Sequence, residues 1–210
     1  MKKILMVLAV FCFIAAPETF AQNKALLKAM KKEKKEKMKE YERENWKLLG
    51  SSRSLEVALL SHYDKLEALG EDGKEIVGIA PKCKSKNVGH QMAINNACIT
   101  YSQQAGSSLK GRVVSDMAGD GTTTEAEFDH FYGAYERLVE KEIKGEMTES
   151  YSIIRDNGDG SFEVQSYFIV SESAASKARI RALENAMKES EVAQKHAEKI
   201  ASFVRAGFEN

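Results

Sequence analysis

Residues 151–171, YSIIRDNGDGSFEVQSYFIVS, decide the fold of this 210-residue chain. Two runs rich in β-branched and aromatic residues, 151–155 and 162–171, flank the turn sequence DNGDG at 156–160. Asn-Gly and Asp-Gly pairs between such runs are a strong signal for a β-hairpin. Apolar residues alternate along the second run, with Ser166 as the polar interruption. We therefore expect an antiparallel hairpin with one buried face.

Weaker signals place other elements before this hairpin. The apolar run 74–80, KEIVGIA, ends at Pro81, which cannot continue a hydrogen-bonded ladder, and 111–117, GRVVSDM, is a similar run. Both are predicted to be strands. Apolar residues that recur at helical spacing predict helices over 55–69 and 87–105.

Two more helices are predicted in the second half of the chain. A capping box of Thr124 and Glu127 begins a helix that we expect to end near Gly145. From 172 to 207 apolar residues keep a helical spacing, and a continuous helix of that length would span on the order of 50 Å. Such a helix must break, project or pack on the N-terminal helix.

Together these elements predict an α+β protein with a single domain over 50–210 and a core over 74–187. We expect a small, mainly antiparallel sheet of about four strands packed by helices, with a long C-terminal helix over 172–207. A charged helical arm over 22–49 precedes the domain and holds ten basic and five acidic residues. This arm could attract the more acidic remainder of the chain or face an anionic surface.

The first 21 residues have the pattern of an export signal. Lys2 and Lys3 precede an unbroken apolar stretch at 4–16, and small residues follow at the cleavage positions of 19–21. Thirteen apolar residues are fewer than the ~20 that a membrane-spanning helix needs. We expect cleavage near Ala21 and a periplasmic or secreted mature protein without a transmembrane helix.

Cys83 and Cys98 remain after removal of this leader. In an oxidising compartment an even pair of cysteines is a disulfide candidate, and closing this short loop would contribute ~3 kcal/mol. The alternative is that both are small apolar residues, one in a loop and one in a helix.

Patterns for catalysis or metal binding are incomplete. The four histidines fall in different predicted helices without a second ligand at metal-binding spacing. The segment 106–112 has Arg112 where a phosphate-binding loop needs lysine, and 116–127 has Ala118 where a calcium loop needs an oxygen ligand. We therefore predict no catalytic, cofactor-binding or metal-binding residues and no enzyme activity.

An aromatic stripe in the helix after Thr124 supplies the candidate ligand or interface side chains. These are Phe131, Tyr132 and Tyr135. They would line an open pocket if the protein bound a small ligand or glycan, and we expect them to be buried instead.

The segment from about Glu75 to Met187 resembles the LPP-twenty-type outer-membrane lipoproteins and the N-terminal domain of flagellar assembly protein T. The resemblance lies in the strands at 76–80, 113–115 and 164–170, in the hairpin through 159–160 and in alanine-spaced helices. The alanines are Ala93, Ala97, Ala105, Ala175, Ala178, Ala182 and Ala186. It implies a small α+β domain of envelope proteins without known catalytic residues. The chain lacks the lipid-attachment cysteine of those lipoproteins and has an additional charged helix.

From these observations we expect an exported, non-enzymatic envelope protein with a structural or assembly role. It would act through contacts with an envelope protein or with itself, and peripheral association with the outer membrane is compatible with this. The alternative is a periplasmic module for a small ligand or glycan. Because the mature chain carries 29 basic and 30 acidic residues, we expect no nucleic-acid partner.

Overall fold

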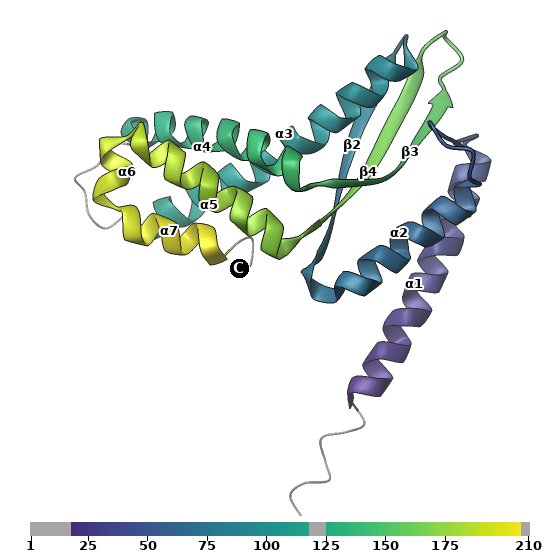
Figure 1. The fold of residues 1–210 in the computed structure, drawn as a ribbon, viewed down its shortest axis with the longest axis horizontal. Coiled ribbons are helices and arrows are strands. Elements are labelled where there is room, and N and C mark those ends of the chain that lie inside the picture. The colour runs from purple at the N-terminus through teal and green to yellow at the C-terminus, as the bar shows by residue number, and fades with distance from the viewer. Residues whose placement is uncertain (1–17, 118–124, 207–210) are drawn as a thin grey trace, which may run out of the picture. The chain divides into compact units, whose positions relative to one another are not determined.

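The computed structural model describes residues 18–117 and 125–206. Contacts divide the chain into two units, Met1–Glu44 and Asn45–Asn210. The described part of the first unit is mainly the helix α1 (Glu18–Arg43), which forms the predicted charged arm (Figure 1). The predicted leader lies almost entirely outside the described residues.

The second unit contains a four-stranded antiparallel sheet in the order β1-β3-β4-β2. Its strands are β1 (Lys47–Leu48), β2 (Gly73–Cys83), β3 (Thr148–Asp156) and β4 (Phe162–Ser171). Its helices are α2 (Leu55–Leu69), the short 3-10 helix η1 (Gly70–Asp72), α3 (Lys86–Met117), α4 (Glu125–Glu146), α5 (Glu172–Lys188), α6 (Glu191–Lys195) and α7 (Ala197–Ala206). This arrangement confirms the predicted α+β class.

The predicted hairpin is formed by β3 and β4, and β4 lies between β3 and β2 in the sheet. Gly158 and Gly160 in its turn have φ angles of 80° and 76°, which side chains disfavour. The Asp156 carboxylate accepts a hydrogen bond from the Gly158 N–H at 2.8 Å. The hairpin therefore forms where the sequence places it.

The charged arm ends earlier than predicted. Its helix stops at Arg43, and Asn45 has a φ of 58°, which a continuing right-handed helix cannot contain. Lys47 and Leu48 then pair with β3 as the fourth strand of the sheet. A two-residue strand is too short to show an alternating pattern in the sequence.

The predicted strand at 111–117 and the predicted helix end at Gly106 are wrong. Both lie inside α3, which is one continuous helix. The buried side chains of the second half of α3 continue one helical stripe, at Tyr101, Ala105, Leu109 and Val113. Burial of this stripe against α4 stabilises the helix more than the local preference of two valines for strand.

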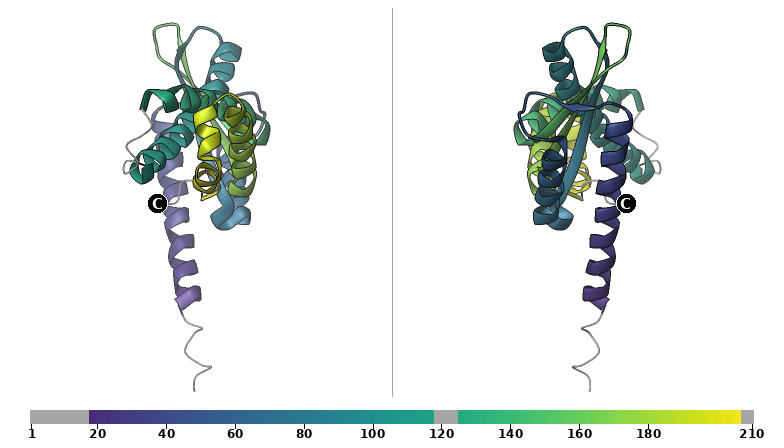
Figure 2. Two further views of the ribbon diagram at one scale, coloured as in Figure 1. Left: turned by 90° about the vertical axis from the view of Figure 1, so that its left-hand side faces the viewer. Right: turned by 90° about the vertical axis from the view of Figure 1, so that its right-hand side faces the viewer.

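The predicted single helix over 172–207 is also wrong, because the segment breaks into α5, α6 and α7. A turn at Glu189 ends α5, and the Ser190 hydroxyl then accepts a hydrogen bond from the Ala193 N–H at 3.2 Å to begin α6. The break lets α7 pack back beside α5, where Ile200 and Val204 are buried (Figure 2). Of the three outcomes expected for this segment, breaking is confirmed.

Helix α3 connects the two halves of the second unit. Its first half packs on one face of the sheet, and its second half packs with α4, α5 and α7 in a helical layer (Figure 1). The other face of the sheet is contacted by α2, over the stacked rings of Tyr151 and Tyr167, whose centroids are 4.5 Å apart. No helix in the described ranges is both long and apolar enough to cross a membrane.

The hairpin turn carries a testable ion pair. Hydrogen bonds from Lys82 and Ser161 lower the pKa of Asp159 from 3.8 to about 2, and Lys82 Nζ lies 2.7 Å from the carboxylate. Because folding lowers the pKa of Asp159, its ion pair stabilises the folded protein at pH values above the ordinary aspartate pKa of ~3.9. This stabilisation is lost as the pH falls towards 2.

We expect an NMR titration of Asp159 to give a midpoint near 2, and Lys82→Met to move that midpoint towards the ordinary value of ~3.9. Lys84→Met removes an exposed lysine and should leave the midpoint unchanged. A midpoint near ~4 in the unmodified protein would contradict the described turn.

Candidate functional site

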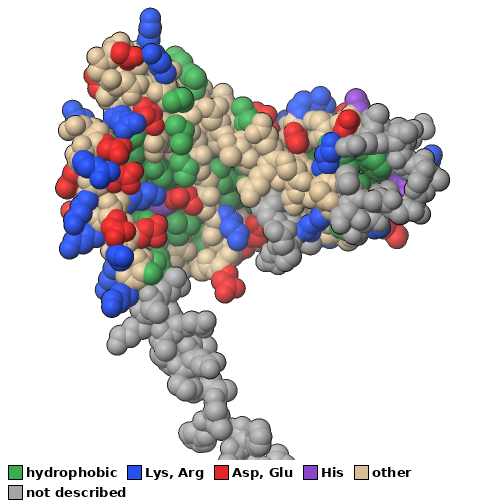
Figure 3. Space-filling model, turned by 180° about the vertical axis from the view of Figure 1, so that it is seen from behind, with side chains coloured by type: hydrophobic (Ala, Val, Ile, Leu, Met, Phe, Trp, Pro, Cys, Tyr) green, Lys and Arg blue, Asp and Glu red, His purple; other side chains and the backbone are tan. Residues whose placement is uncertain are grey.

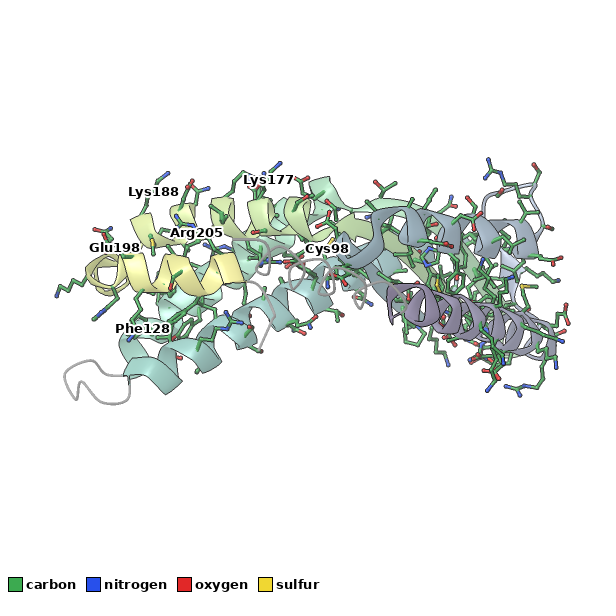
Figure 4. The ribbon with its side chains drawn as sticks, turned by 90° about the horizontal axis from the view of Figure 1, so that it is seen from below. Cys98, Phe128, Lys177, Lys188, Glu198 and Arg205 are labelled. Atoms are coloured by element: carbon green, nitrogen blue, oxygen red, sulfur yellow. The ribbon has the colours of Figure 1, made fainter. Side chains whose placement is uncertain are left out.

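The predicted aromatic residues do not line an open pocket. Phe131, Tyr132 and Tyr135 are buried among α3, α4 and the C-terminal helices, and burial raises the pKa of the Tyr135 phenol. Phe128 of the same stripe also lies among these helices (Figure 4). The expectation of burial is confirmed, although helices rather than the hairpin supply most of the covering.

The structure does not bring Cys83 and Cys98 together. Both thiols are free and buried. Cys83 Sγ donates a hydrogen bond to the Phe162 carbonyl and lies beside Gly89 at the start of α3. Cys98 lies nine residues beyond Gly89 in that helix, which is a rise of about 13 Å along the helix axis. A disulfide needs the two Cα atoms within ~7 Å of each other. The two cysteines are therefore the small apolar residues of the alternative interpretation, although Cys83 ends the strand β2 and does not lie in a loop.

The two incomplete motifs, a phosphate-binding loop and a calcium loop, do not form ligand sites in the part of the chain that the structure describes. The segment 106–112 lies within α3 and forms no phosphate-binding loop. Most of 116–127 lies outside the described residues. Across the ranges that the structure does describe, no three His, Cys, Asp or Glu side chains are grouped so that they could hold a metal ion.

A series of hydrogen-bonded polar side chains, which the sequence did not reveal, connects α3 with the sheet. His90 Nε2 lies 2.9 Å from Glu149, whose carboxylate lies 2.5 Å from the Ser152 hydroxyl, and Ser152 in turn lies 2.8 Å from Ser166. In a serine hydrolase the histidine must stand between the serine and the acid. Here the acid stands between them, so His90 cannot take a proton from either serine.

The best candidate for a functional site is a groove along the outer edge of β2. The groove has a volume of about 240 Å³. Lys74, Glu75, Ile76 and Val77 of β2 form one wall, Thr100, Tyr101 and Gln104 of α3 form the other, and Glu172 closes one end. We call this site the edge groove.

At this edge, some main-chain N–H and C=O groups of β2 point away from the sheet. The Leu49 N–H donates to the Ser152 carbonyl at 2.8 Å, so Ser152 directs its main chain away from β4. Antiparallel pairing alternates, so Ser166 opposite Ser152 faces β2 and bonds with Gly78. Val77 and Ile79, on either side of Gly78, therefore direct their N–H and C=O groups outward. No other described strand pairs with β2 on that side.

One of these outward groups has a side-chain partner. Asn96 of α3 donates a hydrogen bond to the Ile79 carbonyl at 2.7 Å, which confirms that this carbonyl faces α3 rather than β4. Such capping is one way in which proteins reduce the tendency of an open strand edge to aggregate. Val77, two residues before it, is the last residue of the β2 wall of the groove, and its main chain faces the same way.

A buried ion pair fixes the closed end of the edge groove. Arg179 of α5 is 2 % exposed and donates hydrogen bonds to the Glu172 carboxylate and, at 2.6 Å, to the Tyr101 hydroxyl. Burial raises the pKa of the Tyr101 phenol, which keeps it a neutral hydroxyl. The guanidinium thus holds the Glu172 carboxylate and the Tyr101 hydroxyl in fixed positions at this end of the groove. This arrangement fits a positioning role.

Exposed apolar side chains continue from the groove at the other end of β2. Ile79 is 44 % exposed, and Val88 and Met92, one turn apart on α3, are 54 % and 39 % exposed. Met92 is also one turn from Asn96, which bonds the Ile79 carbonyl, so Val88 and Met92 lie near this end of the β2 edge. The Ile79 side chain points to the opposite face of the sheet, because its neighbour Gly78 faces α3. Figure 3 shows apolar side chains gathered over the sheet end of the molecule. These side chains offer apolar contacts on both faces of a strand that would add to this edge.

A second cavity lies under the end of α2. It has a volume of about 420 Å³ and a mostly apolar lining that includes Leu69, Ile169 and Ala174, with Lys65 and Glu146 at its rim. Ser150 has no partner residue on β4 because β3 bulges there, and its buried hydroxyl makes no hydrogen bond. This cavity has the size of a small-molecule site.

Comparison with models of protein families, with curated proteins and with solved structures found no match to this chain. The resemblance to envelope lipoproteins therefore stays a prediction.

Burial of the aromatic stripe has a measurable consequence. Truncating a buried phenylalanine costs about 3–5 kcal/mol, so we expect Phe131→Ala to lower the free energy of unfolding by that amount in urea titrations. Leu60→Ala removes a side chain that is 42 % exposed and should change it by less than about 0.5 kcal/mol. A near-neutral Phe131→Ala would indicate that this ring lines a ligand pocket instead.

Proposed function

We propose that this protein is an exported, non-enzymatic envelope protein that binds an extended segment of a partner protein along β2. The observation that carries the proposal is the outward main chain of Val77 and Ile79 beside the edge groove. An extended peptide that adds to a sheet edge gains affinity from main-chain hydrogen bonds and specificity from its alternate side chains.

The groove has the parts that strand addition requires. The main chain of Val77 supplies an outward donor and acceptor at the end of one wall, and Thr100 and Gln104 of α3 supply polar contacts on the opposite wall. Ile79, Val88 and Met92 extend the contact with apolar surface. Either a partner protein or a second copy of this chain can bind in this way, since both can present an extended strand to the edge of β2.

A second candidate function is the binding of a small apolar molecule in the 420 Å³ cavity under α2. The observation that favours it is the Ser150 hydroxyl, which is buried beside the cavity without a hydrogen-bond partner. Placing a few polar groups in an apolar cavity is typical of small-molecule sites. A small molecule that co-purifies with the unmodified protein but not with the Ser150→Val variant would favour this candidate.

Proline at position 77 tests strand addition directly. Val77→Pro removes the outward N–H but leaves the ladder to β4, because proline is tolerated at a strand edge where its nitrogen faces outward. Val77→Ala is the matched control, since it shortens the side chain and keeps the N–H. We expect both variants to stay folded by circular dichroism.

The readouts are light scattering for self-association and quantitative capture from envelope extracts. The unmodified protein and Val77→Ala should give the same complexes. Val77→Pro should weaken them by about tenfold, as expected when one N–H donor is lost and its acceptor in the partner is left unpaired. A folded Val77→Pro that keeps every complex would contradict strand addition. Bond hydrolysis that Glu172→Gln abolishes would contradict the non-enzymatic function.

A further inference from the structure

A row of cations follows one face of α1. Successive residues of an α-helix are turned by about 100°, so residues three, four or seven apart share a face. One such face carries six exposed basic side chains, which we call the basic stripe. They are Lys28, Lys31, Lys32, Lys35, Lys39 and Arg43.

The basic stripe spans about 22 Å from its first to its last member. Glu42 is the one acid among the described side chains of this face, and Glu33, Glu36 and Glu40 follow the adjacent face. Glu36 lies 3.7 Å from Lys32, but their side chains are 66 % and 77 % exposed. An ion pair so exposed is weak, so Lys32 can exchange Glu36 for another anion at little cost.

The opposite side of α1 has a different character. Met30, Met38 and Tyr41 lie there with Lys34 and Lys37, and all five are half-buried or buried, whereas every member of the basic stripe is exposed. The fully exposed cations of α1 are therefore gathered on one side of the helix. Binding through the basic stripe would be electrostatic, without apolar insertion.

We propose that the basic stripe binds an anionic phospholipid surface, with α1 lying flat along it. Charge complementarity identifies the partner: a straight row of cations on one face matches a flat sheet of negative headgroups. Single-stranded nucleic acid would also require aromatic stacking side chains between the cations, and the basic stripe contains none.

The expected size of the effect follows from the number of cations. Each lysine or arginine near an anionic membrane contributes about a fivefold increase in partitioning. Replacing four members of the basic stripe should therefore weaken binding by at least about 100-fold. Binding should also fall to background as salt rises from about 0.05 to 0.5 M, because salt screens exposed charges.

The test uses the chain from Gln22 onward, so that the apolar stretch 4–16 does not itself bind lipid. Sedimentation would be measured with vesicles of phosphatidylcholine containing about 30 % phosphatidylglycerol, and with phosphatidylcholine alone. The stripe variant combines Lys28→Gln, Lys31→Gln, Lys35→Gln and Lys39→Gln, which keep good helix formers. The control variant combines Lys84→Gln, Lys141→Gln, Lys177→Gln and Lys188→Gln, and so loses the same charge from exposed positions.

Two of the control residues, Lys177 and Lys188, point away from the helices of the second unit (Figure 4). We expect the unmodified and control proteins to sediment with anionic vesicles only, and the stripe variant to stay in solution. Equal binding by the stripe variant, absence of binding by the unmodified protein, or tighter binding to duplex DNA than to vesicles would overturn the proposal. Val77→Pro should leave vesicle binding unchanged, which separates this result from the fate of the edge groove.

Discussion

The close contact between the backbones of α3 and β2 is the constraint on which the second unit depends. A Cβ at Gly78 would overlap the Ala93 carbonyl and would lie 2.8 Å from the Ala97 nitrogen. Ala93 and Ala97 are themselves fully buried. Only small residues at these positions let the helix lie directly on the strand, so α3 is held at one height above the sheet. Gly89 meets the same requirement near Cys83.

This contact also builds the edge groove. Because α3 lies against the Gly78 face of β2, the stripe of Asn96, Thr100 and Gln104 runs beside the strand edge instead of over the solvent. The Asn96 amide can then reach the Ile79 carbonyl, and Tyr101 can reach Arg179 in the helical layer. A helix that packed further from the sheet would leave the edge of β2 as an ordinary solvated edge. The groove is therefore a product of small residues that lie far from any recognisable motif.

The sequence predicts some parts of this arrangement better than others. The DNGDG turn is local and specific, so the β3–β4 hairpin could be predicted from it. The length of α3 could not, because Gly106 and Gly111 resemble helix ends, whereas the packing of Leu109 and Val113 against α4 decides the structure. Ser190 gives a capping signal for α6 only once the break before it is known.

The candidate site is harder to find in the sequence than the fold. Lys74 and Pro81 are typical of an edge strand, and they could have marked β2 as one. The direction of the Val77 main chain depends on the pairing of β2 with β4, and the ion pair between Arg179 and Glu172 spans two turns of α5. Such features depend on the tertiary structure and leave no spacing pattern in the chain.

The free energy of unfolding of Gly78→Ala tests the central contact most directly. The added methyl group meets backbone atoms that cannot rotate away, so the account predicts a loss of about 2–3 kcal/mol or more in urea titrations. Gly133→Ala is the matched control, because nothing lies within 4 Å of its Cβ, and alanine should stabilise α4 by up to ~1 kcal/mol. A Gly78→Ala protein as stable as the unmodified one would show that α3 does not lie directly on β2.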